Sequence, residues 1–76
     1  MKEILQTIIE NLVDNKDAVS IKEEQDDTTI AFEVRVSEDD MGKIIGKQGK
    51  IASSIRTIMK SVAAKEHKRI SIEFVE

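Results

Sequence analysis

Apolar residues near the start of the chain recur with the period of an α-helix. They form adjacent pairs that repeat every four positions: Ile4, Leu5, Ile8, Ile9, Leu12 and Val13. Residues with this spacing share one face of a helix, so the pattern predicts a helix over residues 2–14 that packs one face on a core. A polar run over residues 14–17 ends this helix.

Further along, apolar and polar residues alternate, which is typical of strands. Val19 and Ile21 begin a short alternating segment, and a turn is expected at residues 25–27. The clearest alternation covers residues 30–36, where every second residue is apolar: Ile30, Phe32, Val34 and Val36. A last segment alternates over residues 70–74. These patterns predict three strands, each with one buried face.

Between the second and third strands, the sequence predicts two helices joined by a tight corner. Ser37 can cap the first helix, and the acids at residues 38–40 favour the positive end of its dipole. Three consecutive side chains at a helix start point in different directions, so this interpretation is favoured over a metal site. The first helix is expected to end at Gly46 with a left-handed residue, and the second to begin near Lys50.

The second of these helices carries a wide apolar stripe. Its members are Ile51, Ala52, Ile55, Ile58, Met59, Val62 and Ala63. At about 100° per residue they spread over roughly 140°, which is more than one small sheet covers. Ile51, Ile58 and Val62 lie on or near one margin and are candidate contacts with a partner subunit. Coverage of this margin by the first helix of the chain is the alternative.

The elements occur in the order α-β-β-α-α-β and predict one α+β domain over residues 1–76, with a three-stranded mixed sheet and helices on one face. The 76-residue chain has no cysteine and one histidine, so neither disulfides nor zinc are expected to stabilise it. Good helix packing or a partner subunit must do so. No apolar run reaches the roughly 18 residues of a membrane span, so a cytoplasmic protein without a membrane partner is expected.

The net charge of −3 conceals a strong division along the chain. Residues 1–40 contain 4 basic and 12 acidic residues, whereas residues 41–69 contain 8 basic residues and 1 acidic residue. Local field matters more than net charge for attracting a polyanion. The second region can therefore attract phosphate although the whole chain is acidic.

All three glycines lie in the segment GKIIGKQGK, residues 42–50, and three lysines are interleaved with them: Lys43, Lys47 and Lys50. Gly46 and Gly49 lack side chains, so another backbone can approach the corner, where the amides that open the second helix point outwards. This combination predicts a site for an anion, and a sugar-phosphate chain is the natural candidate. A G-x-x-G spacing alone is equally compatible with a simple turn, and the P-loop and dinucleotide patterns are absent.

The segment IIGKQG, residues 44–49, in a β-α-α-β setting resembles the signature of the KH RNA-binding domain, whose G-x-x-G loop clamps about four nucleotides. The α-β-β leader looks like the bacterial type II arrangement. From residue 42 to residue 76 the chain is similar throughout to the small bacterial single-KH proteins of the KhpA type, and the resemblance covers essentially the whole chain. One departure from the wider KH pattern is Ala52, where a large aliphatic residue is common; Ile51 lies beside it.

The resemblance implies a non-catalytic protein that binds single-stranded RNA without a cofactor or metal. The residues expected at the RNA backbone are Gly46, Lys47, Gln48, Gly49, Lys43 and Lys50. The bases would lie in an apolar groove between the two helices and the last strand. Its candidate wall residues are Ile44 or Ile45, Ala52 and Ile72, and for each of them ordinary core packing remains an alternative.

Two further features of the composition bear on RNA. The chain has no Trp or Tyr, so aromatic platforms for stacking bases are not expected, and aliphatic contacts and hydrogen bonds to base edges must replace them. The remaining basic residues either extend the positive track or are solvated surface charges: Arg56, Lys60, Lys65, Lys68 and Arg69.

The resemblance also implies a homodimer, or a heterodimer with a larger KH protein of the KhpB (Jag) type. It further implies a role as an RNA chaperone connected with cell-wall growth and cell shape. The alternative is a dimerisation or scaffold module whose partner makes most of the RNA contacts. An enzyme is the least expected class, because no paired carboxylates fall in a predicted cleft and the one histidine is in a loop.

Overall fold

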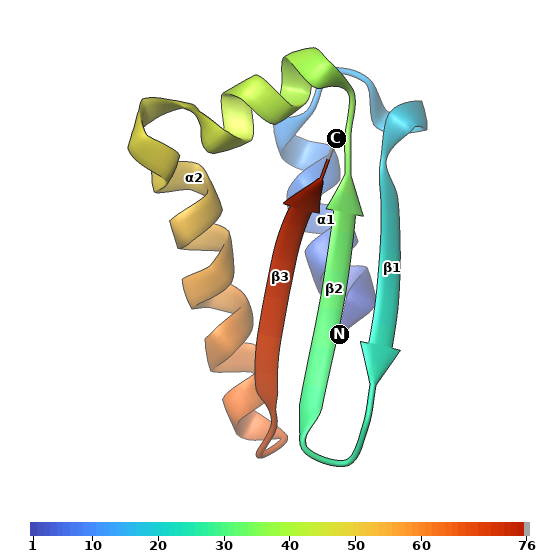
Figure 1. Ribbon diagram of the computed structural model, residues 1–76, viewed down its shortest axis with the longest axis vertical. Helices are drawn as coiled ribbons and strands as arrows, with labels where there is room; N and C mark the ends of the chain where they lie inside the picture. Colours follow the sequence, from blue (N-terminus) through green and yellow to red (C-terminus); the bar gives the residue numbers. More distant parts are fainter. Residues whose placement is uncertain (76) are drawn as a thin grey trace.

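The computed structural model describes residues 1–75, and within them the side chain of Lys47 is not described. These described residues form two α-helices, three strands and one turn of 3-10 helix (Figure 1). Their bounds are α1, Lys2–Leu12; η1, Lys16–Ala18; β1, Ser20–Gln25; β2, Thr29–Arg35; α2, Glu38–Lys65; and β3, Arg69–Val75.

The three strands form a mixed sheet in the order β1-β2-β3. Strands β1 and β2 are antiparallel, with Ile21 opposite Val34, and they form a hairpin. Strands β2 and β3 are parallel, with Phe32 opposite Ile72. A parallel pair needs a long crossover, and α2 supplies it. The predicted mixed sheet is confirmed.

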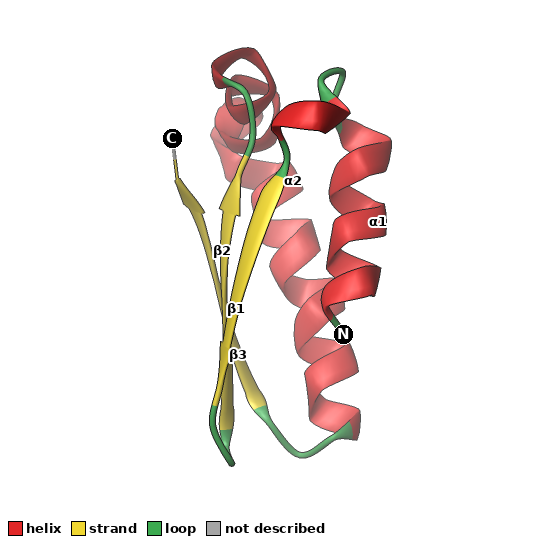
Figure 2. Ribbon diagram, turned by 90° about the vertical axis from the view of Figure 1, so that its right-hand side faces the viewer, coloured by secondary structure: helices red, strands yellow, loops and turns green. Residues whose placement is uncertain are grey.

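Both helices pack on one side of the sheet, and the other side is uncovered (Figure 2). The alternation of β2 explains this arrangement, because Ile30, Phe32 and Val34 are buried while Ala31 and Glu33 on the opposite side are only partly covered. The core lies between the helices and the sheet. Its other members include Leu5, Ile9, Met41, Ile44, Ile55, Met59 and Ile72. The expected helix-covered face of the sheet is confirmed.

Helix α2 contains two arms that meet at a sharp corner (Figure 1). We call residues 38–45 the first arm, residues 46–49 the corner, and residues 50–65 the second arm. The backbone is left-handed at Gln48, with φ of 63°, and at Gly49, with φ of 70°. A left-handed residue was expected at Gly46, and this prediction was wrong. Gly46 continues the helix, and the reversal occurs two and three residues later, at Gln48 and Gly49. Gly49 tolerates the left-handed backbone without a Cβ penalty.

The ends of α2 show how its boundaries arise. Ser37 is the N-cap, because its hydroxyl accepts a hydrogen bond from the backbone N–H of Asp40, as the sequence predicted. At the other end His67 is left-handed, with φ of 58°. Its N–H donates to the carbonyl of Ala64, and the N–H of Lys68 donates to that of Ala63. This pair of bonds is the Schellman motif, here formed without glycine.

Within the described residues, neither α1 nor α2 has a stretch long and apolar enough to cross a membrane.

Candidate nucleic-acid interface

The corner of α2 has open space around its glycines. A Cβ atom added at Gly46 or Gly49 would meet nothing within 4 Å outside its immediate chain neighbours. Gln48 is exposed, and the corner lies at the upper left of Figure 1, beyond the end of the sheet. The absence of side chains at these positions is therefore not required by packing within the chain. It leaves the backbone accessible to another molecule.

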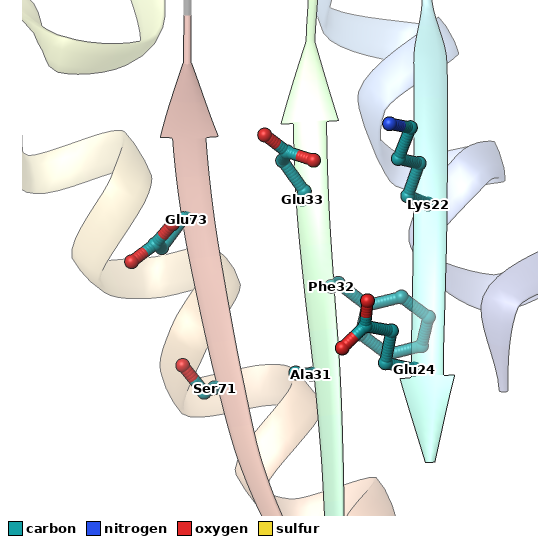
Figure 3. A pocket seen from close by; sticks show the side chains of 7 residues that line it. All are labelled: Lys22, Glu24, Ala31, Phe32, Glu33, Ser71 and Glu73. Carbon is teal, nitrogen blue, oxygen red and sulfur yellow. The ribbon is translucent and has the colours of Figure 1, made fainter.

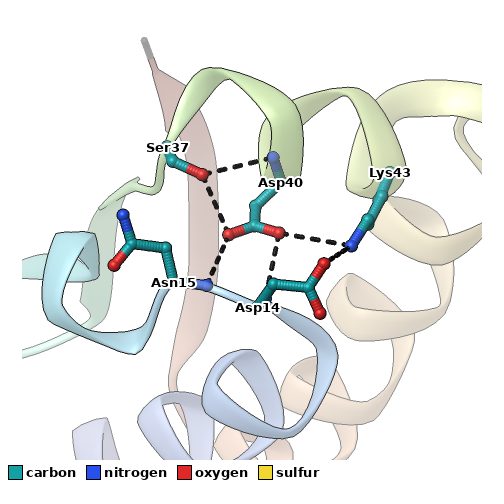
Figure 4. A network of polar contacts seen from close by, with 5 residues as sticks. All are labelled: Asp14, Asn15, Ser37, Asp40 and Lys43. Carbon is teal, nitrogen blue, oxygen red and sulfur yellow. Dashed lines mark hydrogen bonds and ion pairs between the residues drawn. The ribbon is translucent and has the colours of Figure 1, made fainter.

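The first arm is held in place by a buried carboxylate, that of Asp40, which is 1% exposed (Figure 4). Its two oxygens accept hydrogen bonds from the backbone N–H groups of Asp14 and Asn15, both at 3.0 Å, and from the hydroxyl of Ser37 at 2.9 Å. The two backbone donors are the largest reason why the pKa of Asp40 falls from 3.8 to about 2. The segment after α1 is thus tied to the start of α2.

Lys43 belongs to the same network. Its ammonium donates to the exposed carboxylate of Asp14 and lies 3.6 Å from Oδ1 of Asp40. The hydrogen bond to Asp14 is the main reason why the pKa of Lys43 is raised. Lys43 was expected beside the RNA backbone, but here its charge already has carboxylate partners. Lys50 is exposed on the far side of the corner, and the side chain of Lys47 lies outside the described part.

The candidate wall residues of the groove divide into two kinds. Ile44, Ala52 and Ile72 are at most 5% exposed and belong to the core between helices and sheet. Ile45 is 49% exposed, one residue before the corner. Of the four, Ile45 alone presents a large apolar surface to solvent. The other three are buried in the core beneath the surface of the groove.

Basic residues follow the line where the second arm runs beside β3, which we call the seam. The Nε of Arg56 donates to the carbonyl oxygen of Ile72 at 3.3 Å, and its guanidinium lies 5.3 Å from the centre of the Phe74 ring. A shallow hollow of about 320 Å³ continues the seam and is lined by Lys60, Lys68, Arg69 and Ile70. The sequence identified these residues as basic. It could not show that Arg56 bridges α2 and β3, because Arg56 and its partner Ile72 are 16 residues apart in the chain.

An apolar groove of about 310 Å³ separates α1 from the second arm. Its lining residues are Ile8, Leu12, Lys50, Ile51, Ser54, Ile55 and Ile58. Leu12 is 39% exposed and Ile58 is 47% exposed. The structure thus places Ile51 and Ile58, two of the three candidate partner contacts, in one groove that α1 only partly covers. Val62, the third, is half-buried one turn further along.

A separate hollow of about 350 Å³ lies on the uncovered side of the sheet (Figure 3). The small side chains of Ala31 and Ser71 form its floor. Three carboxylates and one ammonium surround it: Glu24, Glu33, Glu73 and Lys22. This excess of negative charge repels phosphate, so the hollow is unsuited to a nucleic-acid backbone.

Within the described residues, no group of three or more acidic or histidine side chains is arranged to hold a metal ion. The acidic residues at the start of α2 serve the helix instead, since Asp40 is occupied by backbone donors.

Comparison with known proteins places these features in a family context. The sequence profile of the KH domain of KhpA and KhpB matches residues 2–74. A protein of Clostridium acetobutylicum named RNA-binding protein KhpA is 47% identical over 75 residues, which cover 99% of this chain and 100% of that protein. Proteins of the same name from Chlamydia pneumoniae and Listeria monocytogenes are 49% and 42% identical over 76 residues, covering all of this chain and 97% and 100% of those proteins.

Proposed function

This chain belongs to the KhpA/KhpB KH-domain family, and we propose that it is a non-catalytic RNA-binding protein whose corner clamps the backbone of about four nucleotides of single-stranded RNA. The observation that carries this proposal is the open space around Gly46 and Gly49, because no neighbouring group of the chain would contact a Cβ atom at either position. The names of the relatives, all RNA-binding proteins, support the same ligand.

The roles of individual residues follow from their positions. Gly46 and Gly49 admit the phosphates, while Lys47 and Gln48 supply a charge and an amide between them. Lys50 flanks the far side, and Lys43 can contribute once a phosphate replaces Asp14 as its partner. Ile45 offers the exposed apolar surface for a base. The buried residues Ile44, Ala52 and Ile72 shape this wall from beneath.

A charge reversal at the corner tests the proposal. The double variant Lys47→Asp and Gln48→Asp is expected to lose RNA binding, because phosphate would meet two carboxylates. Its thermal stability should stay near that of the wild type, since aspartate tolerates the left-handed backbone at position 48 well. Fluorescence anisotropy with a labelled single-stranded RNA in low salt measures the first effect, and thermal unfolding measures the second.

A matched control makes the same two exchanges elsewhere. Lys2→Asp and Gln6→Asp change the net charge equally on exposed positions of α1. This control should retain most of the RNA affinity. If the corner variant binds as tightly as the wild type, or if the control loses as much affinity, the corner is not the RNA site.

The apolar groove between α1 and the second arm favours a second activity, association with another KH protein. Leu12 and Ile58 expose large apolar surfaces there, which a partner protein can cover. Association would also strengthen RNA binding. One clamp makes only a few phosphate contacts and binds weakly and with strong salt dependence, whereas pairing two clamps raises the effective concentration of the second. We expect a homodimer or a heterodimer with a KhpB/Jag-type protein through Ile51, Ile58 and Val62. Ile58→Asp should reduce the mass measured by light scattering to that of one chain.

In the cell, we place this protein in the cytoplasm as an RNA chaperone that acts with such a partner in gene-expression control and in cell-wall and cell-shape homeostasis. The alternative is a scaffold module whose partner makes most of the RNA contacts. A salt titration of RNA binding by the isolated protein separates the two roles. Saturable binding near physiological salt supports the first role, and its absence supports the second.

A further inference from the structure

The guanidinium of Arg56 is anchored at one of its donors. Its Nε donates to the carbonyl oxygen of Ile72, on the edge of β3 that faces the second arm, and the ring of Phe74 lies 5.3 Å away. A guanidinium has five N–H donors in a rigid plane. The hydrogen bond at Nε and the contact of one guanidinium face with the ring therefore restrain the orientation of the whole plane.

The opposite end of this group is available to a ligand. Among the described residues, the two Nη atoms of Arg56 have no hydrogen-bond or ion-pair partner, and the residue is exposed. Two N–H bonds at this end point in parallel, which suits a ligand edge with two neighbouring acceptors. An arginine held in this way differs from the lysines of the seam, whose ammonium groups are point charges without a preferred plane.

Arg56 also lies within reach of an RNA strand held at the corner. It is seven residues after Gly49 on the second arm, which corresponds to about 10 Å along the helix axis. A strand of about four nucleotides that begins at the corner and follows the seam passes this position. Lys60, one turn further along, borders the hollow that continues the seam.

We propose that Arg56 is a specificity-determining residue that selects guanine or cytosine at one position of the bound RNA. This inference rests on the proposed function and adds base preference to it. Guanine presents O6 and N7 as neighbouring acceptors, and cytosine presents O2 and N3. Adenine and uracil have no edge with two neighbouring acceptors, because a donor or a C–H group separates their acceptors. The two Nη donors can therefore be satisfied together only by the first pair of bases.

The test compares four RNA octamers of equal charge: oligo(U), oligo(A), oligo(C) and alternating GU. Wild-type protein is expected to bind oligo(C) or the GU octamer about tenfold more tightly than oligo(U) and oligo(A). Arg56→Lys keeps the positive charge and removes the planar pair of donors. It should abolish this preference while changing the affinity for oligo(U) less than about twofold. The favoured octamer identifies the base.

Lys60→Ala is the matched control, since it removes a charge from the same seam. It should weaken binding of all four octamers by a similar factor and leave their ranking unchanged. Thermal unfolding of Arg56→Lys measures any stability that is lost with the hydrogen bond to Ile72. Such a loss would lower the affinity for all four octamers alike, so it cannot by itself explain a change in base preference.

The possible failures are distinguishable. If wild-type protein binds none of the octamers, the proposed function fails. If it binds all four alike, if Arg56→Lys retains the preference, or if Arg56→Lys weakens all four equally, RNA binding stands and base selection by Arg56 is refuted. The wild-type ranking tests the inference even if a variant does not fold.

Discussion

Replacement of Gly46 by alanine separates folding from RNA binding. Gly46 continues the first arm of α2 in helical conformation, and an added Cβ would meet nothing within 4 Å. Glycine inside a helix is about 0.5–1 kcal/mol less favourable than alanine because it loses more backbone freedom on folding. Gly46→Ala should therefore stabilise the protein by about this amount.

The expected change in melting temperature follows from the chain length. Unfolding entropy is about 2.1 cal/mol/K per residue, or roughly 160 cal/mol/K for 76 residues. A gain of about 0.5–1 kcal/mol then raises Tm by about 3–6 °C. RNA affinity should move in the opposite direction, because the methyl group occupies the space proposed for the sugar-phosphate chain. Losing one charge-assisted hydrogen bond costs about 1.5–3 kcal/mol, roughly a 10- to 150-fold loss of affinity.

Thermal unfolding followed by circular dichroism and RNA anisotropy in the same buffer measure both effects. Gly42→Ala is a matched control, since Gly42 is also helical with open space around it but lies about one turn before the corner. It should raise Tm similarly and leave RNA affinity nearly unchanged. A lower Tm for Gly46→Ala would refute the helical assignment. A higher Tm with unchanged RNA affinity would refute close approach of RNA to this residue.

Four further outcomes follow from the same geometry. Gly49→Ala should destabilise the protein by about 1 kcal/mol, because its φ of 70° is unfavourable for any residue with a Cβ, and Tm should fall by several degrees. Conversely, His67→Gly should raise Tm, since it relieves the left-handed strain at the C-terminal end of α2. The lowered pKa of Asp40 means that its ionised form stabilises the fold above pH 3.8, and that this contribution is lost as the pH falls towards about 2. The Tm difference between wild type and Asp40→Asn should therefore be constant above pH 5 and shrink across this window; a constant difference down to pH 2 would contradict the assignment. Asp14→Asn removes the ion pair between Lys43 and the exposed carboxylate of Asp14. RNA affinity in low salt should then rise a few-fold, and the slope of log affinity against log salt concentration should steepen by about 0.7. An unchanged slope would show that Lys43 does not contact phosphate.

The local features of this fold were predictable from the sequence alone. Alternation over residues 30–36 identified the central strand and its buried face, and the pairs of apolar residues in the first segment identified α1. Ser37 was correctly identified as a helix cap. The reason is physical: helix and strand periods, and the bond from a cap to a backbone N–H three residues later, involve neighbours in the chain.

The corner was located only approximately. The glycine spacing indicated a break in α2, but glycine permits left-handed backbone at either Gly46 or Gly49, so the sequence does not choose between them. The structure places the reversal at Gln48 and Gly49, with Gln48 adopting it despite its Cβ. Packing of both arms on the same core selects that register.

Three features of the candidate site depended on the tertiary structure. Asp40 receives its backbone donors from residues 25 and 26 positions earlier, and Arg56 reaches a carbonyl 16 positions later. The groove that exposes Leu12 and Ile58 exists only because α1 crosses beside the second arm. The sequence by itself determined the type and order of the elements and which face of the central strand is apolar, since these depend on short-range periodicity. Which charges are neutralised and which apolar surfaces stay open was decided when distant segments packed together, because no local pattern encodes those distances.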